Sequence, residues 1–244
     1  MGKSDKPLIV KGKRLDGRAF DEVRDMKIKA RVIPQADGSC ELEIGETKVI
    51  AAVYGPKKVL PKHKEEATRA HLNVIYSMDA FSTSERCRPG PSRRSKEISK
   101  VMNEALAPAI ILEKYPLTAI NVFVNIINAN AGTRTAAINA VSVALADAGI
   151  EMRDLVASVA AGKIDGEIVV DLFQDEDNFG DGDLPIAILP RSGEITLLQF
   201  DGDMTSAEVK KAISMCKKAC LKIAEMQRKA IVDAYSAEKK VIVE

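Results

Sequence analysis

The chain has 244 residues, with 36 lysines and arginines against 35 aspartates and glutamates, which leaves a net charge of +1. Hydrophobic residues make up 46% of the sequence and charged residues 29%, so a disordered or fibrous protein is excluded. The absence of Trp and an aromatic content of only 4% argue against an aromatic-rich binding surface, and the balanced total charge gives no sign of a nucleic-acid partner.

The first half of the chain begins with strand patterns. Predicted strands cover residues 26–33, 40–44, 47–54 and 71–76, and the second of these alternates apolar and acidic side chains. The dipeptide Asp37-Gly38 predicts a hairpin turn between the first two strands. A helix is expected to open after Ser92, and Pro108 should kink or end it.

The second half repeats this order of strands and helices. Predicted strands cover residues 120–126, 156–161, 167–172, 186–189 and 195–199, and an Ala-rich helix covers residues 133–148. Gly149 is suited to stop that helix. The last helix is expected to begin at Thr205, which forms a capping box with Glu208, and to run to about Tyr235.

Strands followed by helices, twice over, indicate an α+β fold. We expect one domain over residues 1–244, with two similar halves (about 14–115 and 116–235) and an N-terminal extension (1–13). No apolar run reaches the ~18 residues that a membrane span needs, and the polar N-terminus carries no secretory signal. The four cysteines lack CxxC spacing, so we expect reduced thiols in a cytoplasmic protein.

The charges are segregated along the chain. Residues 57–100 carry eleven basic and five acidic residues, whereas residues 163–208 carry two basic and twelve acidic ones. Within the second stretch, residues 165–183 hold eight carboxylates and no basic residue. A solvated charged face explains either stretch alone. A basic region beside an acidic loop is also what a metal-assisted site acting on polyanions requires.

Three short segments carry candidate chemistry. Gly132, Thr133 and Arg134 stand where a strand ends and a helix begins, so they form either a simple helix cap or a phosphate cradle on the free amides of the first turn. Four arginines fall within residues 86–94, which favours either a bound anion or a surface contact.

The third segment is the acidic stretch that contains Asp177 and Asp183. Two carboxylates across a Gly-containing turn could hold Mg²⁺ or protonate a leaving oxygen, and an acidic surface loop is the alternative. A phosphate cradle, an arginine cluster and a carboxylate pair are together the parts of a phosphoryl-transfer site.

Several longer blocks occur in a fixed order: RLDGR (14–18), ADGS (36–39), AAVYGP (51–56), RPGPSRR (88–94), AGTRTAA (131–137), ALADAGI–MRDL (144–155) and the acidic loop before Leu184-Pro185. In this order they resemble the RNase PH family of phosphorolytic exoribonucleases, and within it the catalytic RNase PH-like subunits of archaeal exosomes. The resemblance covers about residues 13–235. It implies duplicated β-α units similar to domain 2 of ribosomal protein S5.

The resemblance also implies roles for the acidic and glycine-containing segments. Asp177 and Asp183 match the family's paired catalytic aspartates, which serve as general acid and as ligands of Mg²⁺, or of Mn²⁺ in its place. Gly132, Thr133 and Arg134 match its binding loop for inorganic phosphate, the co-substrate.

Basic residues receive implied roles as well. Arg94 matches a residue that contacts phosphate, and Arg93 and Arg94 both match arginines on the 3′-terminal RNA backbone. Lys62, His63 and Arg69 lie in a segment that faces the RNA path in similar proteins.

One position departs from the family pattern. Asn130 stands where the family usually has Asp, which removes a negative charge near the phosphate loop. Because Asn can still accept a hydrogen bond, we expect the rate to be tuned rather than abolished.

The implied function is phosphate-dependent 3′-to-5′ shortening of single-stranded RNA to nucleoside diphosphates, with reversible tail addition. The implied partners are a related inactive RNase PH-like subunit, in a hexameric ring of three heterodimers, and RNA-binding cap proteins, with no membrane. We therefore expect the isolated chain to be weakly active or inactive. A non-catalytic RNA-binding ring subunit and a bacterial-type homohexameric tRNA-trimming phosphorolase are the alternatives.

Overall fold

We describe the protein from a computed structural model that covers residues 7–10, 12–88 and 90–242, with side chains described up to residue 236. The strands are β1 (Ile9–Val10), β2 (Lys13–Arg14), β3 (Met26–Ala30), β4 (Gly38–Ile44), β5 (Thr47–Lys58), β6 (His71–Met78), β7 (Thr118–Asn128), β8 (Ala157–Ile164), β9 (Glu167–Val170), β10 (Gly182–Ile188), β11 (Ile195–Leu198) and β12 (Asp201–Gly202). The helices are α1 (Arg93–Leu106), α2 (Thr133–Asp147), α3 (Gln174–Phe179) and α4 (Ser206–Ile242), with short 3₁₀ turns at Lys62–Lys64, Ala107–Ala109 and Leu112–Lys114. None of the helices within these ranges is both long and apolar enough to cross a membrane.

The first sheet has the strand order β3-β4-β5-β7-β6. Its strands are antiparallel neighbours except for β6, which runs parallel to β7. β4 buries Cys40, Leu42 and Ile44 and leaves Glu41 and Glu43 partly exposed, the period of two expected for a sheet with one covered face. β7 belongs to this sheet, so the first sheet extends past residue 115, where the sequence placed the boundary between the two halves of the chain.

The second sheet has the order β11-β10-β8-β9, and β12 pairs antiparallel with the first two residues of β10. β8 is buried along almost its whole length: α2 and α4 both pack against it, and Ile164 at its end packs with Leu8, Val169 and Leu172 in a second cluster. A strand covered on both faces reads as a continuous apolar run, as the sequence ASVAAGKI does.

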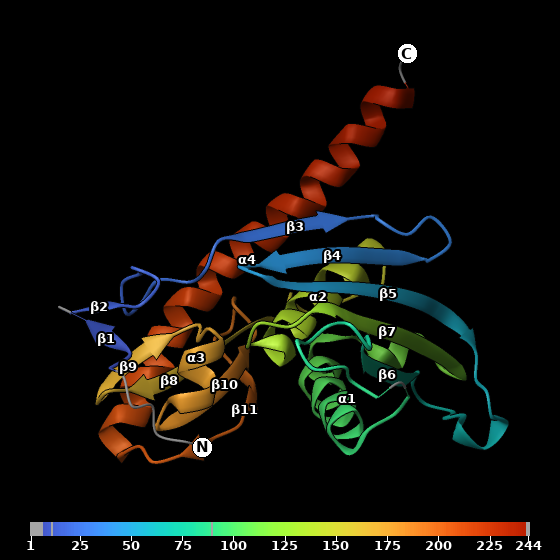
Figure 1. The fold of residues 1–244 in the computed structure, drawn as a ribbon. Helices are drawn as coiled ribbons and strands as arrows, with labels where there is room; N and C mark the ends of the chain where they lie inside the picture. The colour runs from blue at the N-terminus through green and yellow to red at the C-terminus, as the bar shows by residue number, and fades with distance from the viewer. Residues whose placement is uncertain (1–6, 11, 89, 243–244) are drawn as a thin grey trace.

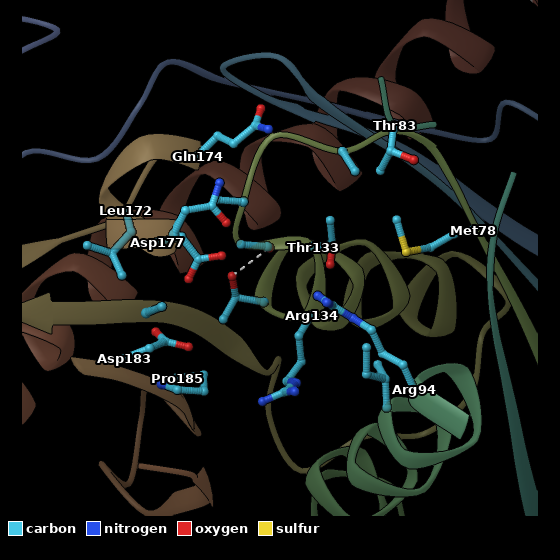
Figure 2. Close-up of a pocket in the computed structure, with 17 residues that line it drawn as sticks. Met78, Thr83, Arg94, Thr133, Arg134, Leu172, Gln174, Asp177, Asp183 and Pro185 are labelled. Carbon is cyan, nitrogen blue, oxygen red and sulfur yellow. Dashed lines mark hydrogen bonds between the residues drawn. The ribbon is translucent and has the colours of Figure 1, made fainter. Parts of the chain in front are cut away.

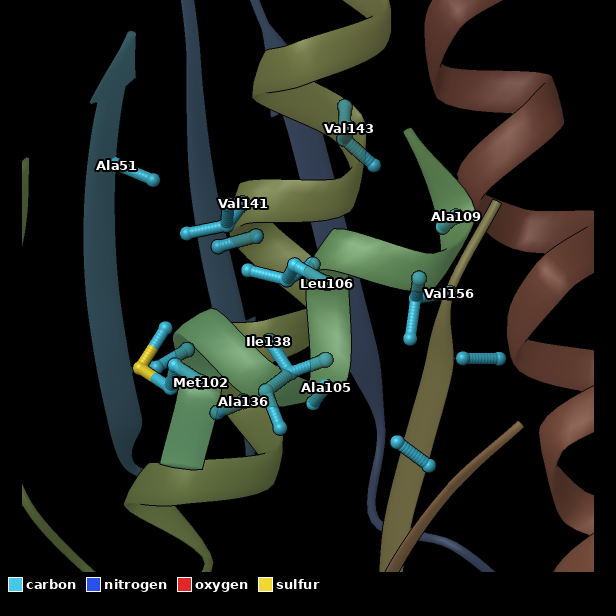
Figure 3. Packing of buried hydrophobic residues seen from close by; sticks show 14 of the residues in the cluster. Ala51, Met102, Ala105, Leu106, Ala109, Ala136, Ile138, Val141, Val143 and Val156 are labelled. Atoms are coloured by element: carbon cyan, nitrogen blue, oxygen red, sulfur yellow. The ribbon is translucent and has the colours of Figure 1, made fainter. Parts of the chain in front are cut away.

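Helix α2 lies between the two sheets (Figure 1). It packs on β4 and β5 of the first sheet and on β8 and β10 of the second, and 13 of its 15 residues are buried. A helix that is apolar all round requires such a central place. Figure 3 shows how Ile138 and Val141 of α2 pack beside Met102 and Leu106 of α1. The N-terminus of α2 is therefore fixed by the core of the molecule.

Most predicted elements are present, and the predicted α+β class is confirmed. Ser92 caps α1 through a reciprocal pair of hydrogen bonds with Ser95, and α1 ends just before Pro108. Gly149 has the left-handed φ of 71° that ends α2. The four cysteines are free thiols, three of them buried.

The predicted hairpin turn at Asp37-Gly38 is wrong. The connection between β3 and β4 spans residues 31–37, and Gly38 is the first residue of β4. A Cβ on Gly38 would lie 2.3 Å from the carbonyl oxygen of Ala144 in α2. Gly38 thus allows β4 to approach α2 closely, and it makes no turn.

Two further differences concern the second half. The acidic stretch predicted as a loop contains helix α3, and β10 begins at Gly182 instead of 186, so Asp177 lies on a helix and Asp183 on a strand. Helix α4 continues to Ile242, seven residues past the predicted end at Tyr235, because residues 236–242 contain the helix formers Ala, Glu and Lys.

Candidate active site

The N-terminal turn of α2 opens into a cleft (Figure 2). Between β7 and α2 the chain turns through Ala131 and Gly132, whose φ angles of 55° and 63° lie in the left-handed region. Gly132 is the N-cap residue, and no side chain caps the amides of the first turn. These amides and the positive end of the helix dipole are therefore available to an anion.

Thr133, the first residue of α2, adds a hydroxyl group to this turn. The Tyr76 hydroxyl donates a hydrogen bond to Thr133 Oγ1 over 3.0 Å. Burial raises the pKa of Tyr76 above its ordinary value, so this phenol remains a donor at neutral pH. Because Thr133 Oγ1 already accepts a hydrogen bond, its own proton is free to be donated to an anion.

Two arginines line the cleft on the same side as this turn. Arg94, the second residue of α1, points toward the start of α2 (Figure 2). Arg134 Nη1 donates to Gln199 Oε1, and Arg134 Nη2 lies 3.6 Å from Glu97 Oε2. Arg134 Nε is out of contact with solvent and has no hydrogen-bond partner among the described residues. A ligand oxygen would satisfy this donor.

Two carboxylates face the arginines from the opposite wall, Asp177 on α3 and Asp183 on β10 (Figure 2). Burial, and after it the neighbouring charge of Asp177, raise the pKa of Asp183 to about 7 against the opposing effect of Arg134. Burial also raises the pKa of Asp177, while Arg94 and Arg134 oppose the rise. Asp183 Oδ1 is buried without a hydrogen-bond partner in the described chain. The pair therefore retains a proton, or takes up a cation, more readily than ordinary aspartates.

A buried ion pair holds α3 in place. Arg14 Nε donates to Glu176 Oε1 over 2.8 Å, and its other nitrogens donate to the carbonyls of Val170 and Asp171 at 2.7 and 2.8 Å. Both side chains of the pair are fully buried. Since Glu176 precedes Asp177, Arg14 fixes the helix that presents Asp177. The RLDGR block gave no sign of this role, because the partners lie 162 residues apart.

Asn130 links the phosphate loop to both neighbouring segments. Its Oδ1 accepts a hydrogen bond from the backbone N–H of Gln174 at 3.1 Å, and its Nδ2 donates to Glu46 Oε2 at 2.7 Å. Arg24 Nη1 donates to the Asn130 carbonyl at 2.6 Å and forms a bidentate pair with Asp171. The expectation that Asn130 still accepts a hydrogen bond is thus met, and its donor is used as well.

Six of the predicted site residues line this one cleft: Arg94, Gly132, Thr133, Arg134, Asp177 and Asp183. The sequence reasoning missed Tyr76 and Gln199, which contact Thr133 and Arg134. Both lie in strands that the sequence predicts. The one signal for Gln199 was a polar side chain at the end of an apolar strand.

The other predicted residues lie outside the cleft. Arg93 is exposed beside Arg94 but does not line it. Lys62, His63 and Arg69 lie between β5 and β6, before the first residue of β6, whereas Met78 at the end of β6 lines the cleft. The eight residues of β6 separate this segment from the cleft by roughly 25 Å. Their contact with RNA stays a prediction.

The arrangement suits the transfer of a phosphoryl group between oxygens. The cleft has a cavity volume of about 220 Å³. No group of three or more His, Cys, Asp and Glu side chains in the described chain could hold a metal ion alone. Asp177 and Asp183 could hold Mg²⁺ only if water and substrate phosphate supplied the remaining oxygens, which is the usual way in which Mg²⁺ binds.

Two family models match most of the chain. Domain 1 of the 3′ exoribonuclease family matches residues 22–151, and domain 2 of that family, RNase PH C-terminal, matches residues 154–219. The exosome complex component Rrp41 of Methanopyrus kandleri is 54% identical over 93% of this chain and 95% of its own length.

Two solved structures share the fold. The crystal structure of Rrp46 from rice (Oryza sativa) has a TM-score of 0.81 at 23% identity and covers 89% of this chain and 99% of its own. The Archaeoglobus fulgidus exosome with RNA bound to the active site has a TM-score of 0.76 at 23% identity and covers 87% and 92%. With both domain matches and the Rrp41 relative, the chain belongs to the RNase PH group of the 3′ exoribonuclease family.

Proposed function

We propose that this chain shortens RNA from its 3′ end by phosphorolysis, as the catalytic subunit of an exosome ring. The observation that carries the proposal is the cleft itself, in which an open helix N-terminus and two arginines face two carboxylates of raised pKa. None of the described residues that line the cleft is Cys, His, Lys or Ser. Threonines and aspartates do line it, but the open helix N-terminus and the two arginines form a site for an anion, so a bound inorganic phosphate fits the role of nucleophile.

Inorganic phosphate is proposed to bind at the start of α2. The first-turn amides, the Thr133 hydroxyl and the Arg94 and Arg134 guanidiniums supply donors on one side of the cleft. Donors fixed before substrate arrives stabilise the charge of the transition state without reorganisation. Gly132 supplies the left-handed φ of 63° at which this turn starts, where a Cβ would also crowd Arg24, 3.1 Å from its Nη2.

The reaction exchanges one phosphorus–oxygen bond for another. An oxygen of inorganic phosphate attacks the phosphorus of the last 3′,5′-phosphodiester, and the bond from that phosphorus to the O3′ of the penultimate ribose breaks. One carboxyl group of the Asp177–Asp183 pair, whose pKa values are raised, protonates the departing O3′, and the other stays ionised. The products are a nucleoside 5′-diphosphate and RNA one nucleotide shorter. In reverse, the same steps add a tail from diphosphates.

Mg²⁺ is proposed as the cofactor, with Mn²⁺ able to take its place. Asp177 and Asp183 would hold it together with substrate oxygens and water, and the unpartnered Asp183 Oδ1 is one available ligand. When bound, the ion would neutralise charge on the phosphoryl oxygens. The arginines orient those oxygens from the other side of the cleft.

The proposed assembly is supported by the names of the relatives. The Methanopyrus relative is an exosome complex component, so we infer that this chain alternates with a related inactive RNase PH-like subunit in a hexameric ring with RNA-binding cap proteins. Arg93, Lys62, His63 and Arg69 would line the RNA path there, and the ring would work in the cytoplasm.

The alternatives are less well supported. A non-catalytic ring subunit would be free to lose the cleft residues, and all six are present here together. A homohexameric tRNA-trimming enzyme would assemble without a partner, so native mass of the chain alone against the chain with the related subunit separates that case.

The test uses 5′-labelled poly(A), Mg²⁺ and the reconstituted ring, with and without inorganic phosphate. The proposal predicts shortening only with phosphate, and nucleoside diphosphates as products. Equal shortening without phosphate, or release of monophosphates, would contradict it.

A further inference from the structure

The Arg134 side chain lines two neighbouring hollows. One is the cleft described above, and the other is a smaller hollow lined by Arg134, Asp183, Pro185, Gln199, Phe200 and Asp201. In Figure 2 the Arg134 guanidinium extends away from Thr133 and lies between Pro185 and Arg94. A long side chain in this place needs partners to hold it, since a free arginine populates many rotamers.

Gln199 is the hydrogen-bond partner of Arg134 in the smaller hollow. Its backbone N–H donates to the carbonyl of Pro185 at 3.1 Å, which ties it to β10. Its Oε1 accepts from Arg134 Nη1, and its Nε2 donates to Glu97 Oε1 at 3.4 Å. Both ends of the amide are therefore occupied, and the Glu97 carboxylate turns the oxygen of the amide toward the guanidinium.

The remaining donors of Arg134 are left for a ligand. Arg134 Nη2 lies 3.6 Å from Glu97 Oε2, beyond hydrogen-bond distance, and the Glu97 side chain is 47% exposed, so that this ion pair is weak. Arg134 Nε is buried and has no partner within the described ranges. Gln199 thus holds one edge of the guanidinium while another donor stays unused.

The charge of the partner matters as much as its hydrogen bond. A carboxylate at this distance would cancel the charge of Arg134 and compete with phosphate for it. The amide of Gln199 is neutral, so it can orient the guanidinium and leave the positive charge in place.

We propose that Gln199 is a positioning residue for phosphate binding: its neutral amide fixes the Arg134 guanidinium in the wall of the cleft without cancelling its charge. This inference rests on the proposed function, because it takes inorganic phosphate as the ligand of Arg134. Gln199 itself need not touch the substrate.

Two substitutions separate orientation from charge. Gln199→Met keeps the length of the side chain but loses the hydrogen bond, and it should weaken phosphate binding about tenfold, as expected for a lost hydrogen bond to a charged group. Gln199→Glu keeps an acceptor but adds a charge, and it should weaken phosphate binding more, by about thirtyfold. The control is Gln35→Glu, which adds the same charge at an exposed position in the 31–37 connection.

Two measurements are made on each full-length variant. Equilibrium binding of inorganic phosphate to the chain is followed by ³¹P NMR, and the phosphate KM and kcat are measured in the ring reconstituted with the related subunit. The expected pattern is a raised dissociation constant and KM for phosphate in both Gln199 variants, with Gln199→Glu the worse. Their kcat at saturating phosphate, RNA affinity and melting temperature should match those of Gln35→Glu.

The outcomes distinguish this proposal from the proposed function. Equal phosphate affinity in wild type and Gln199→Glu, or no phosphate binding to the wild type, overturns the role of Gln199. Weaker phosphate binding in Gln199→Glu supports that role even if the wild-type ring shortens RNA without phosphate, a result that would overturn the phosphorolytic function alone.

Discussion

Glu176 and Asp177 are neighbours on the same turn of α3, yet they have opposite surroundings. Both oxygens of Glu176 accept hydrogen bonds from the buried guanidinium of Arg14. Asp177 faces the cleft, burial raises its pKa, and no cation within the described ranges forms an ion pair with it. One carboxylate holds the helix in place, and the other is left free for a ligand.

The arginines divide in the same way. Arg14 and Arg24 bind Glu176 and Asp171 at full hydrogen-bond distance, whereas Arg94 and Arg134 line the cleft and face its carboxylates. Buried charges that are hydrogen-bonded to each other position a structure, whereas Arg134 is hydrogen-bonded to the neutral Gln199 and lies 3.6 Å from Glu97, so its charge stays available to a ligand. The contrast teaches that pairing, and not residue type, separates the structural from the candidate catalytic charges here.

The largest expected effect is on turnover. Asp183→Asn should lower the rate of phosphorolysis by about 10²–10⁴-fold, because it removes one of the two carboxyl groups that serve as proton donor and metal ligand. Gel assays of RNA shortening by the reconstituted ring measure this, and RNA affinity should stay unchanged. Asp175→Asn, an exposed position on the same helix as Asp177, is the control. An Asp183→Asn ring with wild-type turnover would remove Asp183 from the mechanism.

Breaking the structural pair should cost stability. Arg14→Met leaves Glu176 buried without its cation and should lower the free energy of unfolding by about 3–5 kcal/mol. Urea unfolding followed by circular dichroism measures the change. The double variant Arg14→Met/Glu176→Leu should recover much of the loss, because no unpaired charge remains. If the single variant were as stable as the wild type, the pair would not hold α3.

The pH dependence of stability tests the raised pKa of Asp183. The pKa of Asp183 is raised to about 7 in the folded chain, above the ordinary value of 3.8, so the folded state binds the extra proton between these values. The contribution of Asp183 to the free energy of unfolding is therefore complete below about pH 4 and is lost as the pH rises to about 7. Asp183→Asn should raise the melting temperature at pH 8 and leave it unchanged near pH 4, in metal-free buffer. An equal shift at both pH values would contradict the raised pKa.

The smallest effect concerns Asn130. Asn130→Asp keeps the acceptor for the Gln174 N–H but places a second carboxylate where Nδ2 now donates to Glu46 at 2.7 Å. It should destabilise the chain by about 1 kcal/mol and change turnover only a few-fold. Adding Glu46→Gln should restore stability, as thermal melts can show. A larger loss in the double variant than in Asn130→Asp would mean that Glu46 does not oppose the new charge.

Local patterns predicted most of the fold. The alternation in residues 40–44, the capping residues Ser92 and Thr205, and the stop at Gly149 depend on neighbours within a few positions, and all three behave as expected. Gly38 was misread as a turn residue. The contact that requires a glycine there is with helix α2, more than 100 residues away in the sequence, against which a Cβ would collide. Helix α3 was missed because Phe173, and no Ser, Thr, Asp or Asn, stands at its N-cap, and because the Arg14 that holds Glu176 lies 162 residues away in the sequence.

The sequence also indicated the cleft residues, because their signals are local. Gly132 to Arg134 carry a local signature of a helix start, and the carboxylates stand out by their density in the sequence. The residues that support them gave no signal, because Tyr76, Gln199 and Arg14 act through contacts that only the folded chain forms. Sequence could therefore indicate the charges of the site but not which of them are paired.

The central claim is that inorganic phosphate is the nucleophile in this cleft. The direct measurement supplies ³²P-labelled inorganic phosphate to the reconstituted ring with unlabelled poly(A) and Mg²⁺, and separates the nucleotides released. The account predicts that the label enters ADP as its β-phosphate, in an amount equal to the number of nucleotides removed. Unlabelled AMP as the released product would contradict it.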